Sequence, residues 1–494
     1  MPARVLFIHG WSVDSTATYG ELPARLARDL RLDVQHLHLA KYVSFNDQVR
    51  VSDLAFALEA AIQREVKLAE GERFAVITHS TGGPIVRTWW EKYYHAPGRA
   101  CPMSHVIHLA AAQFGSALAK MGKGPLSRSK SLLKGIEPGV GVLDWLELGS
   151  PESWDLNQLW IRARNVSADP APVFSFCLGG QQIDRKFYDT LNSYTGEMGS
   201  DGVVRVAATN LNASSMRLVQ RQPTAAQYAN KTPSLLELDA DGLLESEPVP
   251  FAIVPGVAHS GEKMGIMNAV RDNAKRYPVL PFLRKCLEVA DHESYLALRE
   301  EFEARNLETI ENERVEIEDR LLLEDRIFLH DACSMVILRV TDDHGKTPED
   351  LRINFTGPNH DPNRLPPGFL LDTQRNHRHP GTFTYFFNHD VMQGCPAIYY
   401  TSGSKRKKVR DALPGIEELG LLIEAFPDQG FARYHPCEAR PSADFLQRAI
   451  KPHATILIDV VLKRVIHEGV FGLTSDLEPK NFKAVKPGKE IAGD

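Results

Sequence analysis

The stretch Phe74–Val86 (FAVITHSTGGPIV) decides how the first half of the chain is interpreted. Its first residues are continuously apolar and predict a buried strand over Phe74–Thr78, and a helix is predicted from Gly82 to about Tyr94. The sharp turn between them, THSTG, would hold the hydroxyl of Ser80 exposed above a sheet, with small residues on both sides because the backbones come close there. The turn therefore predicts that Ser80 is a nucleophile. The alternative is a serine that only caps the following helix.

The beginning of the chain offers a partner for this turn. An apolar strand is predicted over Arg4–His9, and a glycine and Trp11 follow it (FIHGW). The backbone N–H of Trp11 would donate to a developing oxyanion together with the N–H of Thr81, which opens the helix behind Ser80. A simple glycine turn after a first strand is the alternative, and it would be favoured if FIHGW stood alone.

A candidate acid lies in the segment MGSDGVVRV, where Asp201 precedes a glycine and a short apolar run. A strand is predicted over Val173–Leu178, so Asp201 would occupy a loop after a late strand. There a carboxylate can orient and stabilise a catalytic imidazolium. The alternatives are an ordinary Asp-Gly turn and a catalytic role for Asp184 or Asp189 instead.

The candidate base is His259, which follows the apolar strand predicted over Pro250–Val254. The chain contains 18 histidines, so one histidine after a strand proves nothing by itself. The order along the chain decides the matter. Ser80, Asp201 and His259 follow one another as serine, acid and histidine, which is the order found in the α/β-hydrolase fold.

The pattern of apolar runs divides the chain. Over residues 1–286, apolar strands alternate with helices and predict a mostly parallel sheet with helices on both faces. Residues 287–325 are charged and predict a helical connector. Short strands without intervening helices over residues 326–477 predict an all-β domain, a β-sandwich. Residues 478–494 predict a polar tail. Within the first domain, Leu238–Leu243 (LDADGL) resembles the start of a Ca²⁺-binding loop, but the later ligand spacing does not fit, so it is interpreted as an ordinary turn.

Composition narrows the class of protein. The 57 basic and 63 acidic residues among 494 are interspersed, which gives no reason to expect a nucleic-acid partner. The six cysteines are far apart and form no C-x-x-C pair, which is typical of reduced thiols rather than of a disulfide framework or a zinc site. No apolar run reaches the roughly 18 residues needed to cross a bilayer, and the first residues already predict a strand rather than a signal peptide. A cytoplasmic protein is expected, with export that needs no cleaved signal left open.

Up to about Gly265 the sequence resembles the lipase branch of the α/β-hydrolases, which includes bacterial triacylglycerol lipases, lecithin:cholesterol acyltransferase-like enzymes and inositol-deacylase-like esterases. The SDGVV segment around Asp201 is similar to the acid loop of that branch. At His108–Ser116 (HLAAAQFGS), only the final Gly-Ser matches the Thr-Pro-His-x-Gly-Ser stretch that is frequent in the family. Thr78 stands where the G-x-S-x-G motif has its first glycine. These departures leave the subfamily open but do not affect the resemblance to the α/β-hydrolase superfamily.

The resemblance implies a serine carboxylic-ester hydrolase that acts on lipid esters, a lipase or phospholipase. It would use Ser80, His259 and Asp201 through an acyl-enzyme, without cofactor or metal. An acyltransferase or thioesterase with the same three residues, and a non-catalytic binding protein on a hydrolase fold, are the alternatives. By analogy, the C-terminal domain is expected to dock on a membrane surface or on a protein partner. A chain ending near Glu311 would then still hydrolyse a short soluble ester but lose activity on bilayers. The alternative is that the β-sandwich covers an apolar face of the hydrolase and is needed for folding.

Residues 115–165 lie where such enzymes insert a lid or cap. The segment carries Lys120, Lys123, Arg128, Lys130 and Lys134 without an acid among them, and then turns apolar. A basic and apolar lid would suit an anionic phospholipid surface. A solvated cationic loop followed by a helix packed on the core is the alternative, and it is slightly favoured.

Overall fold

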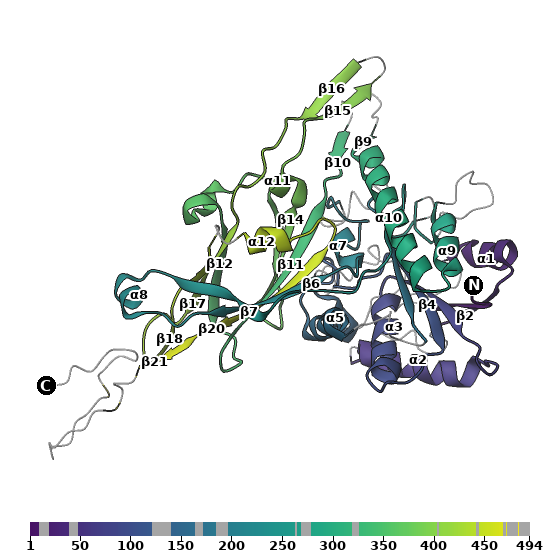
Figure 1. Cartoon of the computed structure of the whole chain (residues 1–494), viewed down its shortest axis with the longest axis horizontal. Helices are drawn as coiled ribbons and strands as arrows, with labels where there is room; N and C mark the ends of the chain where they lie inside the picture. Colours follow the sequence, from purple (N-terminus) through teal and green to yellow (C-terminus); the bar gives the residue numbers. More distant parts are fainter. Residues whose placement is uncertain are drawn as a thin grey trace.

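The first half of the chain forms a parallel sheet between two layers of helices (Figure 1). The computed structural model describes residues 1–8, 19–38, 48–120, 140–163, 171–183, 196–261, 264–267, 278–318, 326–402, 405–440, 444–467, 471 and 483. Within these residues the sheet has the strand order β2-β1-β3-β4-β5-β8, and all neighbouring strands are parallel. The strands are β1 (Arg4–Ile8), β2 (Asp33–Leu37), β3 (Phe74–His79), β4 (Met103–Leu109), β5 (Phe174–Gly179) and β8 (Phe251–Ile253).

Alternate residues of these strands face the two helical layers. In β1, Val5 and Phe7 belong to the core formed with α1, α9 and α10, whereas Leu6 and Ile8 belong to the core formed with α2 and α3. A period of two with apolar residues on both sides is what a sheet buried on both faces requires. The helices are α1 (Leu22–Leu30), α2 (Val51–Glu65), α3 (Gly82–Trp90) with the π-helical turn η2 (Glu91–His95), α4 (Val140–Leu146), α5 (Pro151–Ala163), α7 (Val206–Thr209), α9 (Val279–Glu288) and α10 (His292–Glu313).

The second half builds a mixed sheet with the strand order β12-β17-β19-β7-β6-β20-β11-β14-β13. The sheet curls on itself, as ring contacts between its two ends show. Phe355 of β12 contacts Tyr385 and Phe387 of β14, which is next to last in the strand order, and the ring centroids are 4.9 Å apart in both pairs. The predicted β-rich half after a parallel sheet covered by helices is thus confirmed. The strands are β6 (Ser214–Gln220), β7 (Ser234–Glu245), β11 (Cys333–Asp342), β12 (Asp350–Thr356), β13 (Leu370–Arg375), β14 (Thr382–Asn388), β17 (Gly420–Phe426), β19 (Cys437–Ala439) and β20 (Thr455–Leu462).

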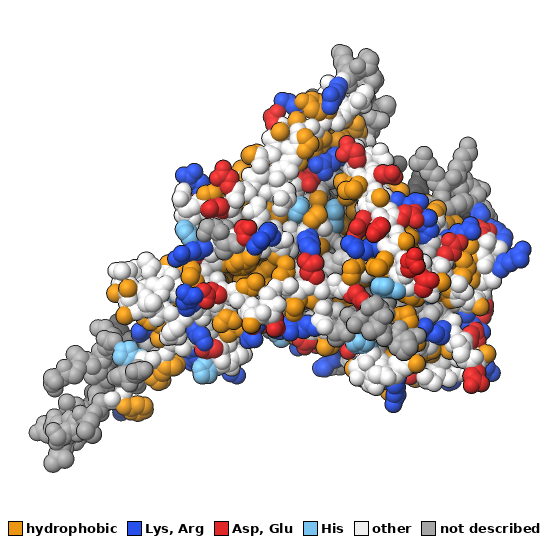
Figure 2. All heavy atoms as spheres, viewed as in Figure 1, with side chains coloured by type: hydrophobic (Ala, Val, Ile, Leu, Met, Phe, Trp, Pro, Cys, Tyr) orange, Lys and Arg blue, Asp and Glu red, His pale blue; other side chains and the backbone are white. Residues whose placement is uncertain are grey.

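Smaller elements decorate this half. Three two-stranded sheets pair β9 (Val315–Glu318) with β10 (Arg326–Leu329), β15 (Ile398–Ser402) with β16 (Lys405–Arg410), and β18 (Ala432–Tyr434) with β21 (Arg464–Ile466); the helices are α8 (Ala225–Asn230), α11 (His389–Gln393) and α12 (Phe445–Ala449). In Figure 1 the β15–β16 hairpin projects from the body of the molecule. Basic and acidic side chains are interspersed over the face in Figure 2, in keeping with the balanced composition.

Two strands of the second sheet come from the first half of the sequence. β6 and β7 precede β8 along the chain, yet β6 pairs with β20 and β7 pairs with β19. Figure 1 shows these teal strands running among the green and yellow ones. Leu238–Leu243, interpreted as a turn, lies within β7, opposite a register shift between Met216 and Leu218 of β6. The division of the chain at residues 286 and 326 stays a prediction. The topology shows that β6 and β7, which precede residue 286, pair with strands that follow residue 326.

β11 joins the two halves through both of its faces. Val336, Leu338 and Val340 point into the core enclosed by the curled sheet. Met335 and Ile337, which alternate with them, belong to a different core that also contains side chains of the first half, among them Phe114, Trp154, Val204 and Ala207. The second sheet is therefore packed against the hydrolase half by an apolar interface, not tethered to it by a free linker.

Parts of the predicted connector and of the predicted lid pack into the hydrophobic cores of the first half. Tyr295 and Phe302 of α10 enter the first core, and the hydroxyl of Tyr295 donates to the carbonyl of Ser175 in β5 at 2.8 Å. In the lid region, Val142 and Trp145 of α4 pack with α2 and α3. The basic residues Lys123, Arg128, Lys130 and Lys134 lie outside the described residues, so a basic lid stays a prediction. No helix in the described part of the chain has both the length and the hydropathy to cross a membrane.

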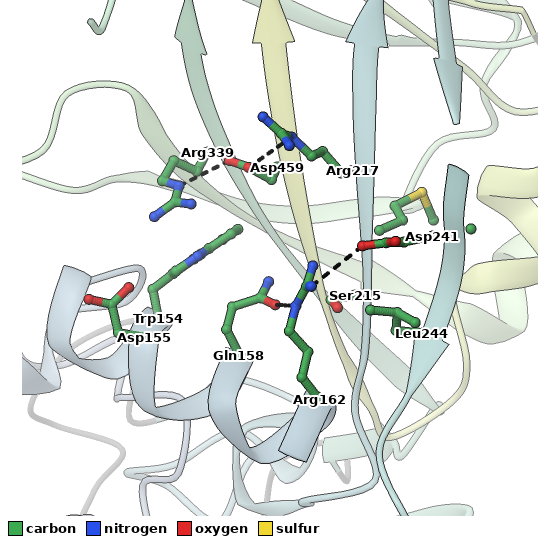
Figure 3. A pocket seen from close by; sticks show the side chains of 12 residues that line it. Trp154, Asp155, Gln158, Arg162, Ser215, Arg217, Asp241, Leu244, Arg339 and Asp459 are labelled. Atoms are coloured by element: carbon green, nitrogen blue, oxygen red, sulfur yellow. Dashed lines mark hydrogen bonds and ion pairs between the residues drawn. The ribbon is translucent and has the colours of Figure 1, made fainter. Parts of the chain in front are cut away.

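A cleft of about 220 Å³ lies between α5 and the second sheet. Figure 3 shows Trp154, Gln158 and Arg162 of α5 along one wall, with Arg162 paired to Asp241 of β7 at 3.5 Å. The guanidinium of Arg339 lies 4.4 Å from the centre of the Trp154 ring. None of the three candidate catalytic residues lines this cleft.

His105 makes the stability of the first half depend on pH. Its Nε2–H donates to the carbonyl of Val289 at 2.9 Å, and burial lowers its pKa to about 4. The unfolded chain, in which histidine titrates near 6.5, binds more protons between these values. This contribution to stability is therefore present above about pH 6.5 and is lost as the pH falls toward 4.

We expect the free energy of unfolding of the full chain to fall by about 2 kcal/mol more between pH 7 and pH 4.5 than that of His105→Gln. Urea denaturation at the two pH values measures both. An equal fall in the two proteins would show that His105 does not carry this dependence.

Candidate active site

Ser80 lies at the sharp turn between β3 and α3, as expected from the sequence. Its φ of 52° is in the left-handed region that residues other than glycine rarely adopt. Three backbone hydrogen bonds hold it there: its N–H donates to Leu109 at 3.2 Å, and its carbonyl accepts from Gly83 at 3.2 Å and from Ala112 at 3.4 Å. The side chain is half-buried at the carboxyl edge of a central strand. The strained turn thus raises this hydroxyl above the sheet.

Thr78 explains how the turn tolerates a residue other than glycine two positions before Ser80. Thr78 is completely buried in β3, and its hydroxyl lies 2.9 Å from Nδ1 of His108 in the neighbouring strand β4. A buried hydroxyl with a partner has no large desolvation penalty. The departure from the glycine motif is therefore accommodated by a polar contact between adjacent strands.

Gly83, at the start of α3, lies close to His108 in β4 and to Ala111 just after that strand. A Cβ atom at Gly83 would lie 2.6 Å from Cβ of Ala111 and 3.1 Å from Nδ1 of His108. Gly83→Ala is therefore expected to lower the free energy of unfolding by about 1–3 kcal/mol, the usual effect of overpacking. Gly196→Ala is the matched control, because a Cβ there would have no neighbour within 4 Å. Equal stability of the two variants in urea titrations would refute the argument.

The structure brings Ser80, His259 and Asp201 together. Nε2 of His259 is 3.2 Å from Oγ of Ser80, and Nδ1 of His259 is 2.9 Å from Oδ2 of Asp201. Ser80 follows β3, Asp201 follows β5 and His259 follows β8. The carboxyl ends of these parallel strands lie at the same edge of the sheet. His259 and Asp201 are buried, with exposed fractions of 5% and 1%. Water therefore has little access to the hydrogen bond between them.

The loop around Asp201 fixes the direction of its carboxylate. Oδ1 accepts from the backbone N–H groups of Val203 at 3.0 Å and Val204 at 2.8 Å, which leaves Oδ2 for His259. The backbone carbonyl of Asp201 also accepts from the N–H of His259 at 2.9 Å. Asp201 and His259 are thus connected through both backbone and side chain. An Nδ1–H held by a carboxylate leaves Nε2 free to accept a proton.

His79 is a neighbour that the sequence did not single out. Its ring lies 4.7 Å from the ring of His259, and its Nε2–H donates to the carbonyl of His259 at 3.1 Å. This residue of β3 therefore supports the loop that carries His259. The sequence signal for His79 is its position directly before Ser80. That position does not distinguish a residue that supports the loop of His259 from one that only fills space in the core.

The remaining predicted site residues are only partly described. Thr81 is the N-cap residue of α3, where backbone N–H groups have no acceptor within their own helix. Its predicted role as an oxyanion donor beside Ser80 stays a prediction. Trp11, the other predicted oxyanion donor, and the rival acids Asp184 and Asp189 lie outside the described residues.

A buried ion cluster beside Asp201 was also missed. Arg205 donates from Nε and Nη2 to the carboxylate of Glu197 at 2.8 and 2.7 Å, and from Nη2 to Asp372 of β13 at 2.5 Å. An arginine within the apolar run VVRVAA is a signal that a buried partner exists. The partner Asp372 lies 167 residues further along the chain, so no local pattern could name it.

Comparison with known proteins places the whole chain. A scan against protein-family models and a search of the curated proteins give no match. Two solved structures of phospholipase PlaB from Legionella pneumophila do match. The one in complex with thio-NAD is 37% identical, with 99% of each chain covered and a TM-score of 0.82. The other is 38% identical, with 97% of each chain covered and a TM-score of 0.83. The chain belongs to the PlaB phospholipase family.

Membership in the PlaB family confirms the resemblance drawn from the motifs of the first half. The chain is an α/β-hydrolase of the lipase branch and a carboxylic-ester hydrolase. The similarity to PlaB also extends over the β-rich second half, which those motifs could not reach. The chain is therefore similar to PlaB over both halves.

Proposed function

We propose that the chain is a serine phospholipase in which Ser80 is the nucleophile, His259 the general base and Asp201 the acid that orients it. The observation that carries the proposal is the continuous contact from Ser80 Oγ through both ring nitrogens of His259 to Asp201. The family relationship supports a phospholipid as the ester that is cleaved.

In this mechanism Ser80 Oγ attacks the carbonyl carbon of the ester while His259 Nε2 takes the hydroxyl proton. The tetrahedral oxyanion would accept hydrogen bonds from the N–H of Thr81 and, as the sequence predicts, from Trp11. The imidazolium, stabilised by Asp201, then gives its proton to the leaving alcohol. This leaves an acyl group on Ser80 and releases a lysophospholipid.

Water completes the reaction. His259 Nε2 removes a proton from a water molecule that attacks the acyl-enzyme and forms a second tetrahedral intermediate. The bond between the acyl carbon and Ser80 Oγ then breaks, His259 returns its proton to Oγ, and the free fatty acid leaves. No cofactor enters these steps. An acyltransferase would carry out the same first half-reaction and replace the water by another alcohol.

Mass-spectrometric profiling of a membrane lipid extract tests the proposal. The extract is incubated with the wild-type chain and, separately, with Ser80→Ala. Free fatty acids and lysophospholipids should accumulate only with the wild type. Added glycerol or cholesterol distinguishes the acyltransferase, because acylated acceptor would then form at the expense of free fatty acid.

A further inference from the structure

Arg205 and Glu197 close the loop that carries Asp201. They lie four residues after and four residues before the acid, and the guanidinium and carboxylate meet in a bidentate contact. Bidentate pairs of this kind fix the relative orientation of both groups as well as their distance. Inside the loop, the N–H of Val206 donates to the carbonyl of Gly199 at 2.9 Å. The backbone on the two sides of Asp201 is therefore fastened by a side-chain pair and by a main-chain bond.

The Arg205–Glu197 pair, called the clasp below, is buried in the interface between the two halves. The side chain of Arg205 is 1% exposed, and those of Glu197 and Asp372 are 13% and 15% exposed. The guanidinium lies 4.1 Å from the centre of the Phe386 ring of β14. Burial opposes the charge of Arg205, but Glu197 and Asp372 outweigh it and raise the pKa of the guanidinium. The cation is thus held between an aromatic face and two carboxylates.

Asp372 attaches this clasp to the second sheet. It accepts from Arg205 and also from Nε2 of Gln374, two residues further along β13, at 3.1 Å. The loop itself sits against the same sheet, because a Cβ at Gly199 would lie 2.7 Å from Sγ of Cys333 in β11. The second half therefore contacts the acid loop directly.

We infer that Arg205 and Asp372 are positioning residues for Asp201: the second sheet holds the acid loop through Asp372, and Arg205 transmits that hold to the carboxylate that orients His259. This inference rests on the catalytic roles proposed for Asp201 and His259. It gives the β-rich half a part in catalysis that does not depend on docking. Misplacement of a catalytic group by about 1 Å can cost up to about a hundredfold in rate, so even a small release of the loop is measurable.

Asp372→Asn is the sharper test. The variant leaves the charge-balanced pair of Arg205 and Glu197 in place, so folding is expected to be retained. The full-length chain is assayed on p-nitrophenyl butyrate, which is soluble. We expect kcat to fall about tenfold with KM within about twofold of the wild type, and Arg205→Lys, which loses the bidentate contact, to fall about a hundredfold. Asp372→Glu, which keeps the carboxylate, should recover most of the activity.

Proton NMR supplies a readout that a purely structural role would not move. The far-downfield signal of the His259 Nδ1 proton, held by Asp201, should shift or broaden in Asp372→Asn below the unfolding transition. Asp144→Asn is the matched control: it removes the ion pair between Asp144 of α4 and Arg378 of the second half without touching the acid loop. Its kcat and NMR signal should equal those of the wild type.

The inference is overturned if Asp372→Asn lowers the unfolding temperature but leaves kcat and the NMR signal unchanged, or if Asp144→Asn lowers kcat as much. An unchanged kcat in Asp201→Asn, measured in the same series, would instead overturn the proposed role of the acid. A loss in Asp201→Asn without any loss in Asp372→Asn would leave that role intact and refute only the positioning.

Discussion

Ser80→Ala is expected to lower kcat for ester hydrolysis by about 10⁶-fold, because the acyl-enzyme can no longer form and removal of a triad serine has an effect of this size. The residual rate would come from binding and oxyanion stabilisation alone. Folding should be unaffected, since the side chain is half-buried and its hydroxyl contacts His259. Removing Oγ leaves the hydrogen bond between His259 and Asp201 in place.

The measurement is the rate of p-nitrophenyl butyrate hydrolysis by purified, folded protein. Ser215→Ala is a matched control, because Ser215 is a buried serine of β6 in the second sheet. It should keep wild-type kcat. Activity of Ser80→Ala within tenfold of wild type would place the nucleophile at another residue.

Asp201→Asn is expected to lower kcat by about 10⁴-fold. The NH₂ group that replaces Oδ2 is a donor and cannot accept a hydrogen bond from the Nδ1–H of His259. The imidazole then adopts the wrong tautomer, and the imidazolium loses the carboxylate that stabilises it. The two N–H groups of Val203 and Val204 that bind Oδ1 fix the orientation of this group, which makes a compensating rotation costly. The loss should appear in kcat with little change in KM.

Asp184→Asn and Asp189→Asn are the controls, because the sequence left both residues as rival acids. Steady-state kinetics on the soluble ester should give near wild-type values for both. If either one reduced kcat more than Asp201→Asn, the acid would have been assigned to the wrong residue.

Much of the candidate site could be predicted from sequence because its signals are local. Ser80 follows a continuous apolar strand and precedes a helix, and that arrangement predicts the turn with positive φ on which the structure places its half-buried hydroxyl. Asp201 and His259 were then selected by chain order and by their positions after late strands. Parallel strands place their carboxyl ends on one edge, so residues after β3, β5 and β8 had to approach one another.

The second sheet could not be predicted in the same way, because its pairing is non-local. β6 and β7 carry polar residues such as Arg217 and Asp239, and the bulge within β7 interrupts the alternation that would indicate a strand. Their partners β20 and β19 lie some two hundred residues further on. Contacts of that kind are decided by packing in three dimensions, which no window of the sequence contains.

The shared strands argue against the expectation that a chain ending near Glu311 keeps its activity. Such a chain would leave β6 without β20 and β7 without β19, and two unpaired strand edges favour aggregation. It would also lack Asp372 and Phe386, which hold the acid loop through Arg205. Docking on a membrane or protein partner through the second half remains a proposal that such a truncation would not isolate.

If Ser80 attacks the ester, its Oγ must also react with a fluorophosphonate probe. The full-length chain is incubated with the probe and digested, and the adduct is mapped by mass spectrometry. We expect one adduct, on Oγ of Ser80, that is reduced in His259→Ala and prevented by prior incubation with phospholipid vesicles. An adduct on another residue, or equal labelling of Ser80→Ala, would contradict it.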